Sequence, residues 1–361
     1  MIAAAIIYGL FIALLFLYLM YPLWLLIYSH KHNQTESFDV TAYEVSVVLF
    51  SYNGGDFLKT KILFLLKEIS KFRNAELIVI DDFSQDGSIE SICSIENENN
   101  LRIIRKCEHK GIPDSMNTAV QYASYSSIVF CDQRQQLECG AIALLVNKLE
   151  HDDCCAASSC ISHISKDNCF SWIRRYENII KNLESCSGSL IGVYGPLYAF
   201  KKSAFSPVPA GIILDDLYLS LKILSKGKII FVKDCIIYDE NVDRLFNYKR
   251  TKRYVNGFAQ IIADRQLMTE LSPKHKLMLF WHKYLRLVIP VLFIAVLILT
   301  VIYAFHSYIA FLLFSALMLG VIYSLTPDLP QFFLTNSFRI NTYYFIAILE
   351  LMVRRIGSVL R

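Results

Sequence analysis

The stretch ELIVIDDFSQDGS, from Glu76 to Ser88, decides the fold expected for this chain. Its first five residues are mostly β-branched and aliphatic, which is typical of a strand buried on both faces. The strand ends at Asp81 and Asp82, and the polar residues that follow favour a turn and a helix cap. Ligands of open parallel sheets bind at the carboxyl ends of the strands, so Asp82 is placed to accept hydrogen bonds from a ligand. An acid that only caps a helix would give the same local pattern.

Strands and helices alternate through the first two thirds of the chain. Strands are expected at Val45–Phe50, Glu76–Ile80, Leu101–Arg105, Ser127–Asp132 and Lys228–Val232, and helices from the turn at Ser51–Asp56 to about Lys71 and at Ser115–Tyr125, Trp172–Ser185, Ile213–Leu224 and Asn247–Ile262. This spacing predicts an α/β fold with a doubly wound, mostly parallel sheet. Two of the strands lead into acids, Asp82 and Asp132, which favours a shared site over two isolated caps.

The second half of the chain adds further polar positions. The segment GVYGPLYAF, Gly192–Phe200, has two glycines that allow close backbone approach to a ligand. The helix ILDDLYLSLKIL carries Asp215 and Asp216 in its opening turn, where acids gain from the helix dipole, although one carboxylate would suffice for that. The basic run in Asn247–Ile262 is typical either of an interfacial helix face or of an anion site.

Composition points to a membrane protein. Hydrophobic residues make up 54% of the 361 residues and charged ones only 19%, too apolar for an ordinary soluble protein. The segment Ile2–Tyr28 contains no charged residue and is long enough to cross a bilayer, which predicts an uncleaved anchor. Apolar runs at Leu287–Phe305 and Tyr308–Leu325 predict a transmembrane hairpin. The net charge of +4 is small, so nucleic acid is not an expected partner.

The cations that flank these runs predict an orientation. They are Lys31, Lys274, Lys276, Lys283, Arg286, Arg339, Arg354, Arg355 and Arg361. The positive-inside rule then gives an integral protein of the inner or plasma membrane with a cytoplasmic catalytic domain. Expected boundaries are an anchor at 1–30, a catalytic domain at 40–270, an interfacial amphipathic helix at 273–286, the hairpin at 287–325, and a cytoplasmic tail with an interfacial helix at 326–361. A zinc site at Cys154, Cys155, Cys160 and His163 is not expected, because paired ligand turns are missing.

The order of these motifs resembles the family-2 inverting glycosyltransferases with the GT-A fold, membrane-associated enzymes of the cellulose, hyaluronan and exopolysaccharide synthase kind. The resemblance covers about Val45 to Ile262 and the arrangement of apolar runs around it. VSVVLFSYNGG is similar to the family's opening strand and turn, and IVIDDFSQDGS to its nucleotide-binding acid motif. FCDQRQQLECGAI resembles the strand and loop that carry the DxD motif, ILDD the TED motif, and RTKRY the QxxRW motif.

The resemblance implies a role for each matching residue on the donor side. Tyr52 and Asp82 would hold the base of the nucleotide. Asp132 would bind Mg²⁺ or Mn²⁺, which would bridge the two phosphates. Arg250 and Arg253 would clamp the diphosphate. Gly111 and Asn117 match the family's loop before the central helix and are assigned to the same nucleotide-sugar site.

The resemblance also implies the catalytic and acceptor groups. Asp216 would be the general base that takes the proton from the acceptor hydroxyl as its oxygen attacks the anomeric carbon. Tyr254, at the family's tryptophan position, would stack beside the acceptor, and Gly195 and Asp215 would line the acceptor side.

Several positions depart from the family pattern. The second DxD acid is Arg134, so that Asp132, Gln133, Arg134 and Gln135 resemble a D-x-R-Q variant of the motif. The usual glutamate after the opening asparagine is Gly54, the usual lysine before the central helix is Ile112, and QxxRW has lost both its glutamine and its tryptophan. Arg134 either neutralises phosphate itself or leaves the metal to other groups.

The leading interpretation is an inverting glycosyltransferase that uses a nucleotide-diphosphate sugar, UDP-linked by family resemblance, and a growing polysaccharide or a lipid-linked acceptor. Both processive synthesis and single transfer fit the sequence. The alternative is an inactive family member that binds nucleotide sugar or scaffolds a synthase complex. A homo-oligomer or a synthase-complex partner is an expected assembly, because the predicted spans are few. A transporter is poorly supported, because no predicted span carries an ionisable residue near its middle.

Overall fold

The computed structural model describes residues 19–29, 39–95, 100–163, 168–239, 247–304 and 333–359, together with positions 9, 315 and 319. The chain divides into two compact units. A sheet unit comprises Tyr28–Glu240 and Thr269–Ser272, and a helical unit comprises Met1–Ile27, Asn241–Met268 and Pro273–Arg361.

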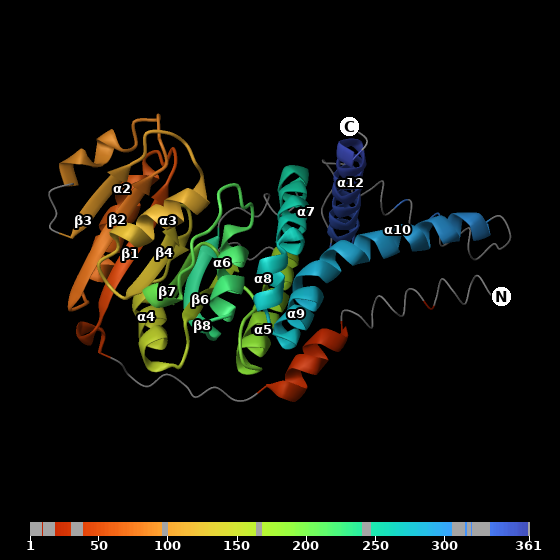
Figure 1. Cartoon of the computed structure of the whole chain (residues 1–361), viewed down its shortest axis with the longest axis horizontal. Helices are drawn as coiled ribbons and strands as arrows, with labels where there is room; N and C mark the ends of the chain where they lie inside the picture. The colour runs from red at the N-terminus through yellow and green to blue at the C-terminus, as the bar shows by residue number, and fades with distance from the viewer. Residues whose placement is uncertain are drawn as a thin grey trace. The chain divides into compact units, whose positions relative to one another are not determined.

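The sheet unit is built on a mixed sheet (Figure 1). Its described strands are β1 (Glu44–Ser51), β2 (Asn74–Asp81), β3 (Leu101–Arg105), β4 (Ser127–Asp132), β5 (Gln136–Leu137), β6 (Ala156–His163), β7 (Leu197–Lys201) and β8 (Ile229–Asp239), in the order β3-β2-β1-β4-β7-β6-β8-β5. Pairing is parallel along β3-β2-β1-β4 and between β6 and β8. It is antiparallel where β7 joins β4 and β6 and where β5 joins β8. The expected α/β fold is confirmed, and the sheet is mixed, with four parallel and three antiparallel pairs of strands.

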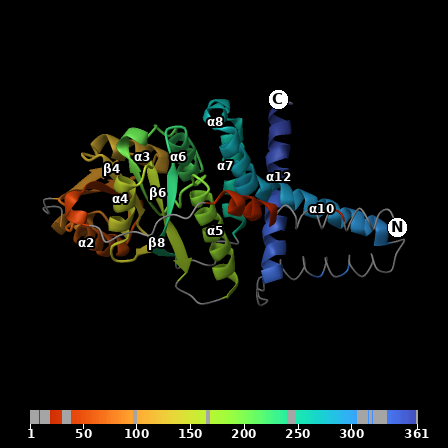
Figure 2. The same ribbon diagram turned by 90° about the horizontal axis from the view of Figure 1, so that it is seen from below.

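Helices cover the sheet on both sides (Figure 2). They are α2 (Phe57–Ile69), α3 (Ile112–Tyr122), α4 (Ala141–His151), α5 (Asn168–Cys186) and α6 (Asp215–Leu224), with short 3₁₀ turns at Val40–Ala42, Glu90–Ile95 and Lys202–Ala204. The double cover explains why seven of the eight residues of β1 are buried. In the core, the Phe130 ring meets Phe50 and Phe200 edge-on, with centroids 4.9 and 4.8 Å apart. Aromatic pairs of this geometry add about 0.5–1.5 kcal/mol each beyond the burial of their surface.

Strand register brings the expected polar positions to one edge of the sheet. Ser51, the last residue of β1, pairs with Asp81 of β2, and Phe50 pairs with Asp132 of β4. The carboxyl ends of these three parallel strands therefore meet, as expected, and Asp82 follows directly on β2.

The helical unit contains the C-terminal helices. They are α7 (Tyr248–Ala263), α8 (Arg265–Glu270, whose last two residues belong to the sheet unit), α9 (Pro273–Leu279), a π-helical turn at Phe280–Tyr284, α10 (Leu285–Ala304) and α12 (Phe333–Val359). Helix α7 is held to α12 at Glu350, which accepts a hydrogen bond from the Tyr248 hydroxyl at 2.5 Å and pairs with Lys252. Near the N-terminus, the Tyr21 ring stacks on Trp281.

The expected localisation is wrong. Among the helices that the structure describes, none combines the length and the apolar character needed to cross a membrane. This finding contradicts the predicted localisation as an integral membrane protein. An apolar run predicts a span only if it forms one sufficiently long, continuous apolar helix, and hydropathy alone cannot establish that. The predicted runs at 2–28 and 308–325 lie largely outside the described residues.

Candidate functional site

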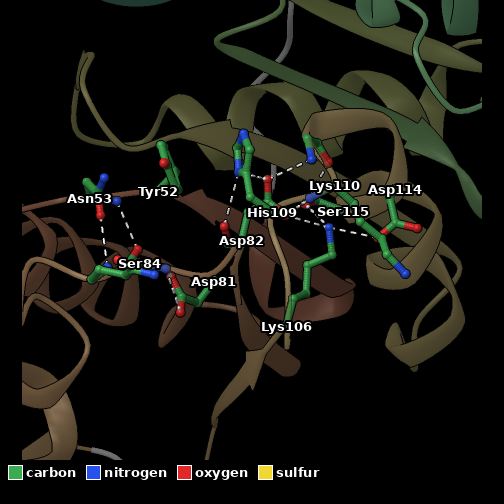
Figure 3. Close-up of polar contacts among 12 residues, drawn as sticks. Tyr52, Asn53, Asp81, Asp82, Ser84, Lys106, His109, Lys110, Asp114 and Ser115 are labelled. Carbon is green, nitrogen blue, oxygen red and sulfur yellow. Dashed lines mark hydrogen bonds and ion pairs between the residues drawn. The ribbon is translucent and has the colours of Figure 1, made fainter.

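Asp82 is the most heavily bonded acid at the polar edge of the sheet (Figure 3). Its Oδ1 accepts hydrogen bonds from Lys106 Nζ at 2.7 Å and from the Lys110 backbone N–H at 3.1 Å. Its Oδ2 accepts from the Gly111 N–H at 2.8 Å. Burial alone would raise the pKa of Asp82, but these donors together outweigh burial and lower it. Asp82 is therefore an anion that ties the loop before α3 to the end of β2.

Gly111 and Asn117 hold that loop and its surroundings in place. Gly111 has φ of +83°, in the left-handed region that favours glycine, and this conformation turns its N–H toward Asp82. The Asn117 amide donates to the Val208 carbonyl at 2.8 Å, and its Oδ1 accepts from the Val208 N–H at 2.9 Å. The amide N–H and the amide oxygen of Asn117 thus both bond to the backbone of Val208.

Tyr52 lies beside this network on the turn after β1. Its side chain is half exposed, and its ring lies 4.3 Å from the ring of His109, centroid to centroid, at an interplanar angle of 30°. His109 Nδ1 in turn lies 2.8 Å from Asp82 Oδ2. The neighbouring Asn53 accepts a hydrogen bond from the Gln85 N–H at 3.0 Å, which fixes the turn against the loop after β2. Tyr52 and Asp82, both predicted to hold the base, are therefore brought together through His109.

Asp132 lies at the end of β4 in a strongly perturbed environment. Burial raises its pKa to about 6, and the nearby carboxylates of Asp216 and Asp239 act in the same direction. The cations of Arg134 and Lys61 oppose this rise. Asp132 and Asp216 are thus close enough for their charges to repel, which brings together two of the three predicted acids.

Sequence reasoning missed two polar residues on the buried face of α2. Lys61 donates from Nζ to the Gln135 carbonyl at 2.6 Å and lowers the pKa of Asp132 by its charge. Glu68 accepts from the Gly140 N–H at 2.6 Å. The helix therefore fixes the loop after β4 at two points. The available signal was their spacing, because both fall among the apolar positions that face the sheet.

The fit of a divalent cation rests on Asp132 and few other groups. Within the described ranges, no group of three or more His, Cys, Asp or Glu side chains is arranged to hold a metal ion. Three buried oxygens, Ser51 Oγ, Gln133 Oε1 and Gln135 Oε1, have no hydrogen-bond partner in the described protein. Mg²⁺ commonly binds through one or two carboxylates, water and substrate phosphates. The described residues thus fit a cation whose other ligands come from substrate phosphate, and they do not form a full coordination shell by themselves.

Asp216 lies in the first turn of α6 against Gly195. Its Oδ1 accepts from the Leu217 N–H at 2.7 Å. A Cβ placed on Gly195 would lie 2.9 Å from Asp216 Oδ2, closer than real Cβ atoms approach. The absence of a side chain at Gly195 therefore leaves room for this carboxylate.

Tyr198 is a further residue that sequence reasoning missed. It lies on β7, pairs with Phe130 of β4, and is 3% exposed. Burial, followed by the charges of Asp215, Asp216 and Asp132, raises its pKa well above the ordinary tyrosine value. Its hydroxyl therefore stays protonated near three carboxylates. The position of Tyr198 beside these acids depends on the pairing of β7 with β4, which local sequence does not show.

The predicted diphosphate clamp lies on α7, in the helical unit. Arg250 Nη2 lies 3.2 Å from the Tyr254 hydroxyl, and the guanidinium lies 5.5 Å from the centroid of that ring. Tyr254 also stacks on Phe258. Arg253 is exposed on the same helix. Arg250 and Tyr254 thus form one cationic-aromatic face.

Replacing Asp132 by Asn should stabilise the metal-free protein above pH 6. The folded pKa of about 6 lies above the ordinary 3.8, so the folded state binds more protons between these values. Its stability therefore falls as pH rises through that window. We expect a gain of roughly 1–3 kcal/mol in the free energy of unfolding at pH 8, and a smaller gain at pH 5. Urea unfolding in chelator measures both. A loss of stability at pH 8 would contradict the assigned environment.

Part of the chain is similar in sequence to known proteins. Residues 46–206 match the family model described as glycosyl transferase family 2. Two Staphylococcus aureus proteins named poly-beta-1,6-N-acetyl-D-glucosamine synthase, from strains MSSA476 and COL, are 24% and 23% identical over 192 residues. The matched region is 51% of this chain and 46% of theirs, so the chain spans about half the length of the curated relatives it matches.

A solved structure extends the fold comparison to almost the whole chain. The mannosyltransferase PcManGT from Pyrobaculum calidifontis, in complex with GDP-Man and Mn²⁺, has a TM-score of 0.76. The likeness covers 96% of this chain and 98% of that one at 20% identity, which shows the fold alone. Residues 46–206 therefore resemble a family-2 glycosyltransferase domain, and the chain shares the mixed α/β fold of the mannosyltransferase.

Proposed function

We propose that the chain is an inverting glycosyltransferase, moving sugar from a nucleotide-diphosphate sugar to a growing polysaccharide or lipid-linked acceptor. The observation that carries the proposal is the placement of Asp82, Asp132 and Asp216 around one edge of a family-2 domain. UDP-N-acetylglucosamine is the favoured donor, because the curated relatives are named as poly-N-acetylglucosamine synthases. GDP-mannose is the second donor to test, because it is bound in the structural relative.

On the donor side, the ring of Tyr52 offers a stacking surface for the base, and Asp82 offers an acceptor for a base N–H. Arg250 and Arg253 supply charge-assisted hydrogen bonds to the diphosphate. Asp132 is the carboxylate for Mg²⁺ or Mn²⁺, which when bound would offset negative charge on the departing diphosphate. The structural relative was solved in complex with Mn²⁺, which supports this assignment. The D-x-R-Q interpretation adds Arg134, whose charge acts on Asp132.

On the acceptor side, Asp216 takes the proton from the acceptor hydroxyl as that oxygen attacks the anomeric carbon. The new C–O bond forms on the face opposite the diphosphate, and the bond to the diphosphate breaks with both of its electrons. The configuration at the anomeric carbon inverts as a result. The family resemblance assigns Asp215, Gly195 and Tyr254 to the acceptor.

A second candidate is an inactive subunit that binds nucleotide sugar within a homo-oligomer or synthase complex. Arg134 favours it, because a cation replaces the second acid of the metal motif. Incubating the purified chain with single nucleotide sugars and an oligosaccharide acceptor, and measuring released nucleoside diphosphate, separates the two. Release with UDP-N-acetylglucosamine or GDP-mannose supports the enzyme. Binding without release in every reaction supports the inactive subunit.

Replacing Gly195 by Ala should slow transfer without weakening nucleotide binding. The added methyl would meet Asp216 Oδ2 at 2.9 Å and displace the proposed base. Because misplacing a catalytic group by about 1 Å can reduce the rate by up to about 100-fold, we expect kcat to fall by about tenfold or more. Steady-state kinetics give kcat, and calorimetry with UDP gives the affinity. Wild-type turnover by Gly195→Ala would show that catalysis does not depend on the close approach of Gly195 to Asp216.

A further inference from the structure

The hydrogen-bonding capacity of Asp82 is nearly used up by the protein itself. A carboxylate offers about four lone-pair positions. Lys106 Nζ and the backbone N–H groups of Lys110 and Gly111 take three of them. The remaining position, on Oδ2, faces His109 Nδ1 at 2.8 Å, and the same nitrogen lies within hydrogen-bond distance of the Asp82 backbone carbonyl, at 3.2 Å. A base N–H that bonds this position of Asp82 would take the place that the His109 ring nitrogen now occupies.

The same imidazole also covers Tyr52. The two ring centroids are 4.3 Å apart, so no second flat ring fits between them. His109 thus presents a flat ring to Tyr52 and a ring nitrogen to Asp82, and Figure 3 shows it between these two residues. A uracil or guanine held by Tyr52 and Asp82 would make the same two contacts, with its ring on the tyrosine and its N–H on the carboxylate.

We propose that His109 holds the base position in the nucleotide-free protein and leaves it when a nucleotide binds. The inference rests on the proposed function and deepens it, because it adds a residue that sets nucleotide affinity. In this proposal, the base of the nucleotide first displaces the His109 side chain, whose flat ring and ring nitrogen make similar contacts.

The imidazole can leave without opening the loop. The His109 side chain is 52% exposed, so solvent lies on one side of it. Lys106 and the N–H groups of Lys110 and Gly111 keep the loop attached to Asp82 through separate hydrogen bonds. A change of side-chain rotamer is therefore sufficient.

The exchange has a defined thermodynamic signature. If the binding-competent state is only a fraction of the free protein, the apparent Kd rises by the inverse of that fraction for every nucleotide. Uracil or guanine restores the lost hydrogen bond to Asp82, because each carries an N–H beside a carbonyl. Cytosine has an acceptor at N3, where uracil has an N–H, and can donate to Asp82 only through its 4-amino group.

Calorimetric titration of the full chain with UDP, GDP and CDP tests the proposal. We expect His109→Ala to bind UDP about tenfold more tightly than wild type, because the competing ring is gone. His109→Phe keeps a flat ring but cannot bond Asp82, so its gain should be smaller. The matched control is Glu108→Ala, which removes an exposed side chain from the same loop and should leave the Kd within about twofold.

Equal or weaker UDP binding by His109→Ala would overturn the proposal, and weaker binding would mean that the base stacks on the imidazole. If neither wild type nor His109→Ala binds any of the three nucleotides, the proposed function itself fails. If wild type binds UDP and His109→Ala binds it no better, only the present inference fails. Thermal unfolding of each variant verifies that it is folded.

Discussion

Replacing Asp216 by Asn is expected to reduce sugar transfer by about 100-fold or more while nucleotide binding survives. The substitution keeps the shape of the side chain and removes the group that would accept the proton from the acceptor hydroxyl. Asp216 Oδ2 lies at the close approach to Gly195, so an amide there retains the packing. The loss should therefore appear in kcat, measured as nucleoside diphosphate released under saturating donor.

Asp153→Asn is a suitable control for Asp216→Asn, because it removes the same charge from a fully exposed side chain. It should turn over like wild type. UDP affinity should agree among all three proteins. Near-wild-type turnover by Asp216→Asn would remove this residue from the mechanism and would leave the general base to be sought elsewhere.

Transfer is also expected to require Mg²⁺ or Mn²⁺ and to lose at least about 100-fold in excess chelator, because a bound cation supplies several kcal/mol of stabilisation to a departing diphosphate. Metal binding needs the Asp132 anion, and the pKa of its carboxyl is raised to about 6 by burial. The cation concentration for half-maximal activity should therefore rise as the pH falls below about 6. Titrations of Mn²⁺ at pH 5.5 and 7.5 measure this shift.

Adding Mn²⁺ beyond the chelator should restore activity in wild type, whereas Asp132→Ala should respond weakly. Full activity in excess chelator would mean that the cations of Arg134, Arg250 and Arg253 neutralise the diphosphate unaided. If the cation concentration for half-maximal activity does not change with pH, the metal does not bind through Asp132.

The strands that position the site could be predicted from local sequence. Strands β3 and β4 were predicted residue for residue, and β1 and β2 to within two residues at each end. Strands β1, β2 and β4 are largely buried and mainly apolar, whereas β3 lies at the sheet edge and is only partly buried. The antiparallel insertion of β7 between β4 and β6 was not predicted, because strand pairing depends on contacts between distant segments. Apolar content near the termini predicted membrane spans, and no described helix satisfies that prediction.

The site was predictable where one residue type implies one chemistry. Acids at strand ends drew attention to Asp82 and Asp132, and a pair of acids in the first turn of a helix drew attention to Asp216. The partners of these acids were not predictable, because they come from other segments: His109 from a loop and Lys61 from the buried face of a helix. The hydrogen bonds that Asp82 accepts depend on the folded loop, and local sequence does not predict them.

The central claim, transfer of sugar with inversion, is tested most directly by the configuration of the product. Nuclear magnetic resonance of the anomeric proton in a product made from UDP-N-acetylglucosamine, whose sugar is α-linked, reports this configuration. A single displacement by an acceptor activated by Asp216 predicts a β-linked product. An α-linked product would contradict inversion and would require a different mechanism.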